Sequence, residues 1–244
     1  MTVLRDADLA AAFDRACRSY DTLAAANPGY RAQLRRSVRR LGPARAGSGR
    51  RVLDLGCGTG ASTAALAAVL PGADLTAVGA WAGMLRRAAR RPLHRPVRFV
   101  HAPVERLAEA GVHGPFDAVF AACLLRNTAG PDAVLARALD LLAPHRRLAV
   151  HAYALSGRAA HRAVWSAVCA TLILPAATLL GQGPLCRHLW RSVVTFDTAG
   201  HLAQRMRRAG CERVRVLPLP GWHTGIAHTF LARRPAPGSQ EAAR

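Results

Sequence analysis

Three glycines alternate with other residues directly after a short apolar stretch, Val52-Leu53-Asp54-Leu55. Gly56, Gly58 and Gly60 have no Cβ atom, so the backbone of this turn can approach a bound molecule closely. The helical pattern that follows places the unpaired N–H groups of a helix N-terminus at the same point. The pattern therefore predicts a strand, a ligand-binding turn and a helix in succession.

The type of ligand is indicated by Asp54, two residues before the first glycine. With Ala61, the turn also fits the G-x-G-x-x-G/A fingerprint of folds that bind nicotinamide dinucleotides. A carboxylate here would repel a pyrophosphate group, whereas it would attract the cationic methionine end of S-adenosylmethionine. The sequence thus favours S-adenosylmethionine over the cofactor of a nicotinamide-dependent oxidoreductase, with a predicted site at Asp54, Gly56, Cys57, Gly58 and Gly60.

Strand and helix patterns alternate along the chain in the order that builds a parallel sheet covered on both faces, which predicts an α/β fold. The expected strands are 51–55, 75–78, 97–101, 116–121 and 147–151, with a closing pair at 213–217 and 226–232. The expected helices are 6–42, which ends at Gly42-Pro43, then 62–70, 84–90 and 131–142.

The length and the apolar content are consistent with one domain over residues 1–234. Within it we expect a helical lead-in at 1–45, a cofactor-binding core at 51–152, a helical insertion on the substrate side at 153–200, and a closing helix and strands at 201–234. The tail, 235–244, has the composition of a disordered segment.

One apolar stretch, 163–180, approaches the roughly 18 to 20 uncharged residues that span a bilayer. Pro175 interrupts it, and it lies late in a pattern that is otherwise typical of a soluble fold. We therefore expect a buried or membrane-grazing helix pair rather than a span, which would suit a lipophilic substrate.

The formal net charge of +20 resembles that of nucleic-acid-binding proteins, but all 34 basic residues are arginine and they are spread along the chain. Solvated helix faces explain this distribution better than a nucleic-acid groove, and attraction to anionic lipid is a third possibility. The cysteines show no paired metal-ligand spacing, so no metal site is expected. The N-terminus has no signal-peptide pattern, which indicates a cytoplasmic protein.

A second motif is more specific than the glycine turn. Residues 116–127, FDAVFAACLLRN, resemble the fourth-strand motif of the ubiquinone/menaquinone biosynthesis C-methyltransferases, which ends in Leu-Arg-Asn. Residues 13–21, FDRACRSYD, resemble the N-terminal segment of that family. Its C-terminal third is similar to 189–193 with Phe196, to Ala209-Gly210 and to 225–228, so the resemblance covers most of the chain.

This resemblance implies a class I S-adenosylmethionine-dependent methyltransferase with a Rossmann-like, seven-stranded, mostly parallel sheet. It also implies methylation of a ring carbon on a small lipophilic substrate of the demethylmenaquinol type. By match to the family, Tyr20 would lie over the cofactor, although an aromatic core residue is an equal interpretation. The ends of the second, third and fourth strands would complete the cofactor site with Gly79, Ala80, Trp81, Val104 and Ala122.

The candidate catalytic residues are Arg126, Asn127 and His151. The matched family positions imply that Arg126 stabilises a developing phenolate and that Asn127 orients it. The alternative is that Arg126 pairs with a carboxylate and Asn127 caps a turn. His151 lies at the end of the fifth strand. It could be a general base, because the ordinary pKa of histidine is about 6.5, or it is a structural residue.

Three positions depart from the family pattern. Gly79 stands where an acid usually binds the ribose hydroxyls, and no acid follows the third strand until Glu105. The usual Pro-Gly-Gly before the fifth strand is Pro144-His145-Arg146. We hypothesise that Trp81 stacks on the adenine and replaces part of the missing binding energy.

Three functional classes therefore remain open. The first is an active methyltransferase for quinols or other lipophilic aromatics, and the second is a small-molecule methyltransferase of another substrate class. The third is a non-catalytic member that retains the fold. Peripheral membrane contact fits the first class, whereas nucleic acid is an unexpected partner because no Asn-Pro-Pro-Tyr base-flipping motif is present. The sequence does not indicate an oligomeric state.

Overall fold

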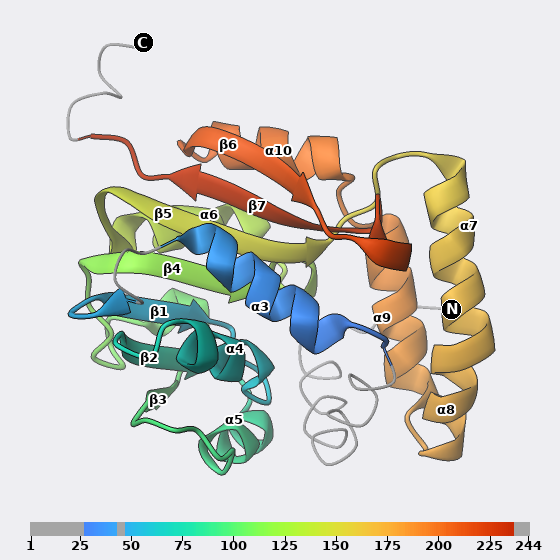
Figure 1. Ribbon diagram of the computed structural model, residues 1–244, viewed down its shortest axis with the longest axis horizontal. Helices are drawn as coiled ribbons and strands as arrows, with labels where there is room; N and C mark the ends of the chain where they lie inside the picture. The colour runs from blue at the N-terminus through green and yellow to red at the C-terminus, as the bar shows by residue number, and fades with distance from the viewer. Residues whose placement is uncertain (1–26, 43–46, 237–244) are drawn as a thin grey trace.

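The computed structural model describes residues 27–42 and 47–236, which contain a seven-stranded sheet in the order β3-β2-β1-β4-β5-β7-β6 (Figure 1). Strands β1 to β5 pair in parallel, and β7 is antiparallel to both β5 and β6. The strands are β1 (Arg51–Leu55), β2 (Asp74–Gly79), β3 (Arg98–His101), β4 (Phe116–Ala122), β5 (Leu142–Tyr153), β6 (Glu212–Pro218) and β7 (Ala227–Arg233). The predicted α/β class and the mostly parallel, Rossmann-like sheet are confirmed.

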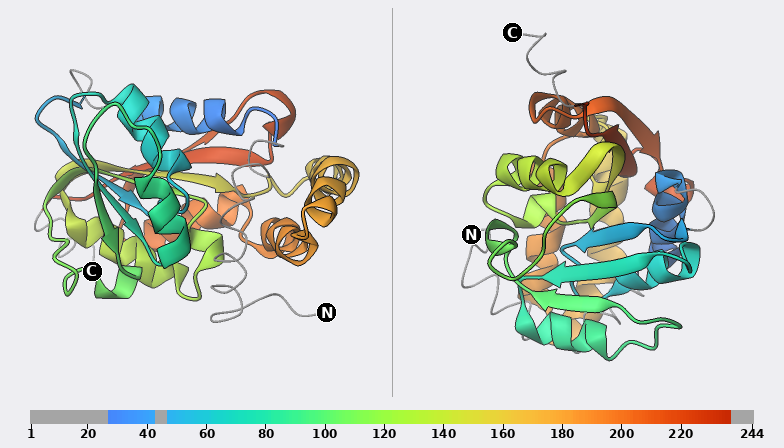
Figure 2. Two further views of the ribbon diagram at one scale, coloured as in Figure 1. Left: turned by 90° about the horizontal axis from the view of Figure 1, so that it is seen from below. Right: turned by 90° about the vertical axis from the view of Figure 1, so that its left-hand side faces the viewer.

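Helices cover both faces of this sheet, as Figure 2 shows from two further directions. α3, α4 and α5 lie on one face, and α6 and α10 lie on the other. The helices of the described residues are α3 (Tyr30–Leu41), α4 (Ala61–Val69), α5 (Ala82–Ala89), α6 (Pro131–Leu141), α7 (Ala159–Val168), α8 (Leu174–Leu179), α9 (Gly183–Thr195) and α10 (Ala199–Arg208). Tyr20, the first part of the expected lead-in helix, and residues 237–244 of the expected tail lie outside the described residues.

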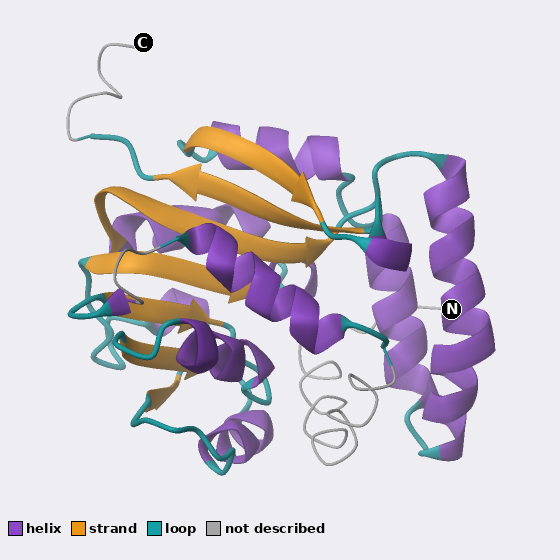
Figure 3. Ribbon diagram, in the orientation of Figure 1, coloured by secondary structure: helices purple, strands orange, loops and turns teal. Residues whose placement is uncertain are grey.

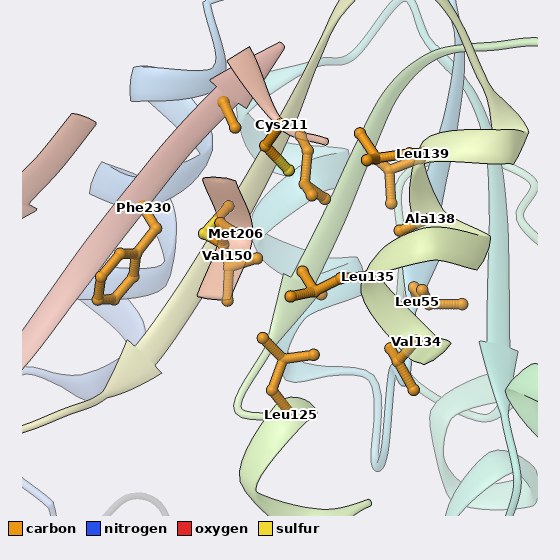
Figure 4. Packing of buried hydrophobic residues seen from close by; sticks show 14 of the residues in the cluster. Leu55, Leu125, Val134, Leu135, Ala138, Leu139, Val150, Met206, Cys211 and Phe230 are labelled. Atoms are coloured by element: carbon orange, nitrogen blue, oxygen red, sulfur yellow. The ribbon is translucent and has the colours of Figure 1, made fainter. Parts of the chain in front are cut away.

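The core is divided by the alternation of side chains along each strand. In β1, Val52 faces α3 and α4, whereas Leu53 and Leu55 face α6 and α10. Figure 4 shows the second layer, where Leu55 and Val150 lie near side chains of α6 and α10. Since burying a Leu or Val side chain contributes about 1.5 to 3 kcal/mol, these two layers fix the register of the strands.

The segment Pro144-His145-Arg146, which lies within β5, has a backbone conformation that a glycine would favour. His145 has a φ of 61°, in the left-handed region, and its N–H donates to the Arg234 carbonyl oxygen at 3.0 Å. The strand itself begins at Leu142, earlier than expected, and its register with β4 shifts between Phe116 and Ala118. The departure from Pro-Gly-Gly therefore changes the residue and keeps a glycine-like backbone.

The apolar stretch that we expected as a buried or membrane-grazing helix pair is one continuous helix from Ala159 to Leu179. It is long and apolar enough to cross a membrane, and only 17 % of its most apolar 18-residue window is buried, so the buried alternative is wrong. Pro175 does not break it, because Pro175 lies in the first turn of α8 after a π-helical segment, Cys169–Ile173. Figure 3 shows this helix standing beside α9 at the end of the sheet.

We predict that His145→Gly stabilises the fold by about 1 kcal/mol, because the left-handed region costs a residue with a Cβ about that much or more. The hydrogen bond to Arg234 uses the backbone and survives the exchange. Urea unfolding monitored by circular dichroism measures the change. As a control, we expect His94→Gly to lower the stability, since His94 has no positive φ and the glycine adds only unfolded-state entropy. Equal effects of the two exchanges would contradict the prediction.

Candidate active site

A cavity of about 710 Å³ opens at the carboxyl ends of β1, β2 and β4, the edge at which open α/β sheets bind ligands. Most of the predicted cofactor residues line it, and both Arg126 and Asn127 do so as well. The lining members of the predicted cofactor set are Gly56, Cys57, Gly58, Gly79, Ala80, Trp81, Val104 and Ala122. Asp54, Gly60 and His151 do not line the cavity.

The glycine turn has the left-handed backbone that its sequence predicts. The φ angles of Gly56, Gly58 and Gly60 are 80°, 52° and 84°. A Cβ atom on Gly56 would lie 2.8 Å from Leu124 Cδ1, and one on Gly60 would lie 3.0 Å from the Ala88 Cβ. Gly56 therefore allows close packing against Leu124 and Gly60 against α5, whereas a Cβ on Gly58 would meet only Met84 Sδ, at 3.9 Å.

Asp54 lies beneath the turn rather than in the cavity. Its carboxylate is buried, and Oδ2 accepts hydrogen bonds from Ser62 Oγ at 2.8 Å and from Thr63 Oγ1 at 2.6 Å. Both hydroxyls belong to the first turn of α4, so the carboxylate ties the end of β1 to the start of that helix. Oδ1 has no hydrogen-bond partner among the described residues.

Burial makes the ionised form of Asp54 costly. It raises the pKa of the carboxyl from 3.8 to about 6, although the hydrogen bonds from Thr63 and Ser62 oppose the shift. The folded protein thus holds this proton more tightly than the unfolded chain. The contribution of the group to stability is complete below the unfolded pKa and is lost as the pH rises through about 6.

At the end of β2, the position of the usual ribose-binding acid has little room. A Cβ on Gly79 would lie 3.2 Å from Leu85 Cδ1 and 3.4 Å from Cys57 Sγ. The neighbouring cavity wall is formed by Trp81, just before α5, and by the exposed Glu105 in the 3-10 turn after β3. Both side chains line the same cavity as Gly79.

Arg126 and Asn127 lie in the 3-10 turn Leu125–Asn127 after β4. Arg126 Nε donates to Ser192 Oγ of α9 at 3.3 Å, and its guanidinium carbon lies 5.9 Å from the centre of the Tyr153 ring. Asn127 Nδ2 donates to the Cys123 carbonyl oxygen at 2.9 Å, so the side chain does cap its turn. Its buried Oδ1 has no partner among the described residues.

His151 is a structural residue in this fold. It is fully buried on the face of the sheet that α3 covers, and its Nδ1 lies 3.0 Å from Ser37 Oγ. Burial, with smaller contributions from Arg126, His223 and Arg40, lowers its pKa to about 3. The expectation of a general base at this position is corrected, because the strand register turns the ring toward α3 and away from the cavity.

Two residues that line the cavity were not singled out by sequence reasoning. Tyr30, at the start of α3, and His188, on α9, come from elements that the glycine turn does not predict. A signal for His188 was present, because it precedes the family-like segment 189–193. It also stands one helical turn from Ser192, the partner of Arg126.

A second cavity, of about 80 Å³, lies between β5 and the insertion. It shares Tyr30, Cys123 and Arg126 with the first, so the two are adjacent. Its wall is mostly aromatic and aliphatic, and the ring centres of Tyr153 and Trp165 are 5.2 Å apart. The remaining residues that line it are Asn27, Cys169, Ile173, Cys186, Leu189, Trp190 and Val193.

We predict that Asp54→Asn raises the free energy of unfolding by up to about 3 kcal/mol near pH 7.5, the free energy that corresponds to a two-unit pKa shift. Near pH 5, which lies between the unfolded and the folded pKa, we expect about half of that gain. Urea unfolding at both pH values measures the difference. Asp74→Asn, at an exposed position, is the control, and a gain from Asp54→Asn that does not change with pH would contradict the prediction.

Comparisons with known proteins agree with this geometry. Residues 52–145 match the family model of a methyltransferase domain. The demethylmenaquinone methyltransferase of Beutenbergia cavernae is 31 % identical over 240 residues, which cover 97 % of this chain and 95 % of that protein. An uncharacterized protein of Synechococcus is 34 % identical over 122 residues, 48 % of this chain, and this chain spans only 29 % of its length.

Solved structures share the fold at low sequence identity. The plantazolicin methyltransferase in complex with S-adenosylhomocysteine has a TM-score of 0.65 and 11 % identity, over 93 % of this chain and 95 % of that one. Three observations agree: the match to a methyltransferase domain, the near full-length relative and the cavity at the glycine turn. The chain belongs to the class I S-adenosylmethionine-dependent methyltransferases, and S-adenosylmethionine is its cofactor.

Proposed function

We propose that this enzyme methylates a ring carbon of a quinol-type aromatic, such as a demethylmenaquinol. The observation that carries the proposal is the aromatic second cavity, which adjoins the cofactor cavity at Tyr30, Cys123 and Arg126. Aromatic side chains in this wall would pack against the ring of such a substrate, and the shared residues would bring that ring next to the cofactor. The name of the Beutenbergia relative, demethylmenaquinone methyltransferase, supports the same substrate class.

The residues around the first cavity fit S-adenosylmethionine. The left-handed turn at Gly56 and Gly58 gives the close backbone approach that the methionine end needs. Asp54 lies buried under this turn, where its negative charge favours a cation above it. We propose that Trp81 stacks on the adenine and that Glu105 accepts from the ribose hydroxyls in place of an acid at position 79.

The cofactor supplies an electrophilic methyl group on a sulfonium, so the protein needs to align the ring carbon with it and exclude water. In the proposed reaction a carbon–carbon bond forms as the carbon–sulfur bond breaks. The ring carbon is made more nucleophilic when the neighbouring hydroxyl loses its proton. Arg126, at the junction of the two cavities, is positioned to stabilise the resulting phenolate.

Asn127 lines the first cavity, and its buried Oδ1 has no partner among the described residues. We propose that it accepts a hydrogen bond from the second hydroxyl of a quinol. Its Nδ2 is held by the Cys123 carbonyl oxygen, which fixes the orientation of the amide. Arg126 and Asn127 would then act on opposite ends of one ring.

The test is methyl transfer from isotope-labelled S-adenosylmethionine to a short-chain demethylmenaquinol under reducing conditions, with the methylated product identified by mass spectrometry. We expect turnover by the wild-type protein. We expect Arg126→Gln to lower kcat by about 100-fold or more, the usual cost of removing one group that stabilises a developing anion. The affinity for S-adenosylhomocysteine, measured by calorimetry, should change little.

Other outcomes discriminate between the remaining classes. Transfer to a different acceptor and none to any quinol would place the enzyme in another substrate class. Absence of measurable S-adenosylhomocysteine binding would indicate a non-catalytic member of the fold. Equal kcat for the wild type and Arg126→Gln would remove Arg126 from the mechanism.

A further inference from the structure

A buried imidazole without a hydrogen-bond partner lies in the wall of the cofactor cavity. The side chain of His188 is 5 % exposed, and neither Nδ1 nor Nε2 has a hydrogen-bond partner among the described residues. Buried polar atoms nearly always have a hydrogen-bond partner, so two unpaired ring nitrogens on one side chain need an explanation. A ligand in the cavity would provide the missing partner.

The neighbourhood of His188 is fixed by α9. Ser192 lies one turn further along this helix and accepts from Arg126 Nε, which places the guanidinium beside the same helix face. Burial and then the charge of Arg126 lower the pKa of His188 from its ordinary value, so the ring is neutral near pH 7. The other titratable residues in this cavity wall are Tyr30, Cys57, Glu105 and Cys123.

We propose that His188 is the base that accepts the hydroxyl proton of the acceptor substrate, an inference that rests on the proposed function. The hydroxyl proton passes to a ring nitrogen of His188 as the oxygen becomes a phenolate. The ring carbon then takes the methyl group while the carbon–sulfur bond breaks. The proton on that carbon leaves to solvent as the imidazolium returns its proton to the oxygen, so one proton is released in total.

The contrast with His151 shows why only one of these buried histidines suits the role. His151 has a partner in Ser37 and lies outside both cavities. His188 lacks a partner and lines the cavity that it shares with Arg126. A base and a cation on the same side of the ring oxygen provide a proton acceptor together with stabilisation of the anion that is left.

The experiment compares wild type, His188→Gln and His188→Asn in the methyl-transfer assay between about pH 5 and 9. We expect both variants to lower kcat by about 100-fold or more, the usual contribution of a positioned base. The affinity for S-adenosylhomocysteine should stay within about twofold of the wild type, because binding does not use the base. The exposed His201→Gln is the matched control and should keep full activity.

The pH profile separates a base from a structural residue. The wild-type rate should be independent of pH around neutrality, because His188 is already neutral there. The residual rate of His188→Gln should instead rise with pH as the substrate hydroxyl ionises in solution. A variant that keeps kcat within threefold of the wild type, or one with a flat profile, would overturn the proposal.

A binding readout distinguishes this failure from failure of the proposed function. With isotope-labelled histidine, the NMR resonance of His188 is followed while 1-naphthol is added to the complex with S-adenosylhomocysteine. If the His188 resonance shifts but no quinol is methylated, the quinol substrate is refuted, and His188 is still supported as a base that binds a phenol. If quinol is methylated but the His188 resonance does not shift on addition of 1-naphthol, the role of His188 as the base is refuted and the proposed function stands.

A second, independent observation concerns the outer surface of the helix from Ala159 to Leu179. Every large hydrophobic side chain that is exposed in the described part of the chain lies on this helix or directly after it. The exposed fractions are 42 % for Val164, 52 % for Leu172, 89 % for Leu179 and 44 % for Leu180. Such a concentration of exposed apolar side chains marks an interaction surface.

The charges around this surface favour one partner. Residues 154–196 contain four arginines, at positions 158, 162, 187 and 191, and no aspartate or glutamate. Exposed apolar side chains flanked only by arginine match the anionic surface of a lipid bilayer. We propose that this surface lies on an anionic membrane, with the helix along the interface. Its inner residues Trp165, Cys169 and Ala177 are buried within the protein.

Vesicle sedimentation tests this surface. We expect the wild-type protein to bind vesicles with phosphatidylglycerol more strongly than vesicles of phosphatidylcholine alone. Leu179→Glu with Leu180→Glu should reduce the binding at least about tenfold, since two carboxylates repel the lipid and two apolar side chains are lost. Ala133→Glu with Ala108→Glu adds the same charge at exposed positions elsewhere, and is expected to have a much smaller effect.

Equal loss of binding in the two double variants would show that scattered arginines, and not this surface, bind the lipid. Absence of vesicle binding by the wild type would also overturn the proposal. Self-association in the ultracentrifuge that disappears in Leu179→Glu with Leu180→Glu would identify the surface as a protein interface instead.

Discussion

The cofactor site depends on a buried carboxylate. Asp54 lies below the glycine turn and accepts from two hydroxyls in the first turn of α4, so one side chain fixes a strand end, a turn and a helix start relative to each other. Burial without a full set of partners makes this charge costly, as its raised pKa indicates. This cost arises directly beneath the glycine turn, and strongly shifted pKa values are typical of functional sites.

A second constraint joins the insertion to this core. Arg126 extends from the turn after β4 to Ser192 on α9 and packs its guanidinium over Tyr153 at the end of β5. The contact positions α9, and with it His188, over the cofactor cavity. Arg126 borders both cavities, so this one side chain links the insertion to the junction between them.

The sequence predicted the strands and helices better than it predicted the directions in which individual side chains point. Alternating apolar residues in β1 and β4, and the glycines after β1, were sufficient to place the strands and the cavity, since both depend on local patterns. Whether the side chains of Asp54 and His151 point into the cavity or toward the covering helices depends on the register of β1 and β5. That register is set by pairing with strands that are distant in the sequence. His188 lies on a helix whose position over the cavity follows from tertiary contacts, so the neighbouring family-like segment 189–193 was not sufficient to identify it as a cavity residue.

The polar network around His151 gives that residue a role at the site without contact to a ligand. Ser37 Oγ lies between His151 Nδ1 and Thr229 Oγ1, at 3.0 and 2.8 Å, and therefore links α3 to β5 and β7. Arg40 strengthens the same link by donating to Thr229 Oγ1 and to the Leu217 carbonyl oxygen. The His151 ring also packs edge-on against Tyr30, with ring centres 6.1 Å apart. Tyr30 lines both cavities, so the buried network between α3 and the sheet packs directly against a residue of the cavity wall.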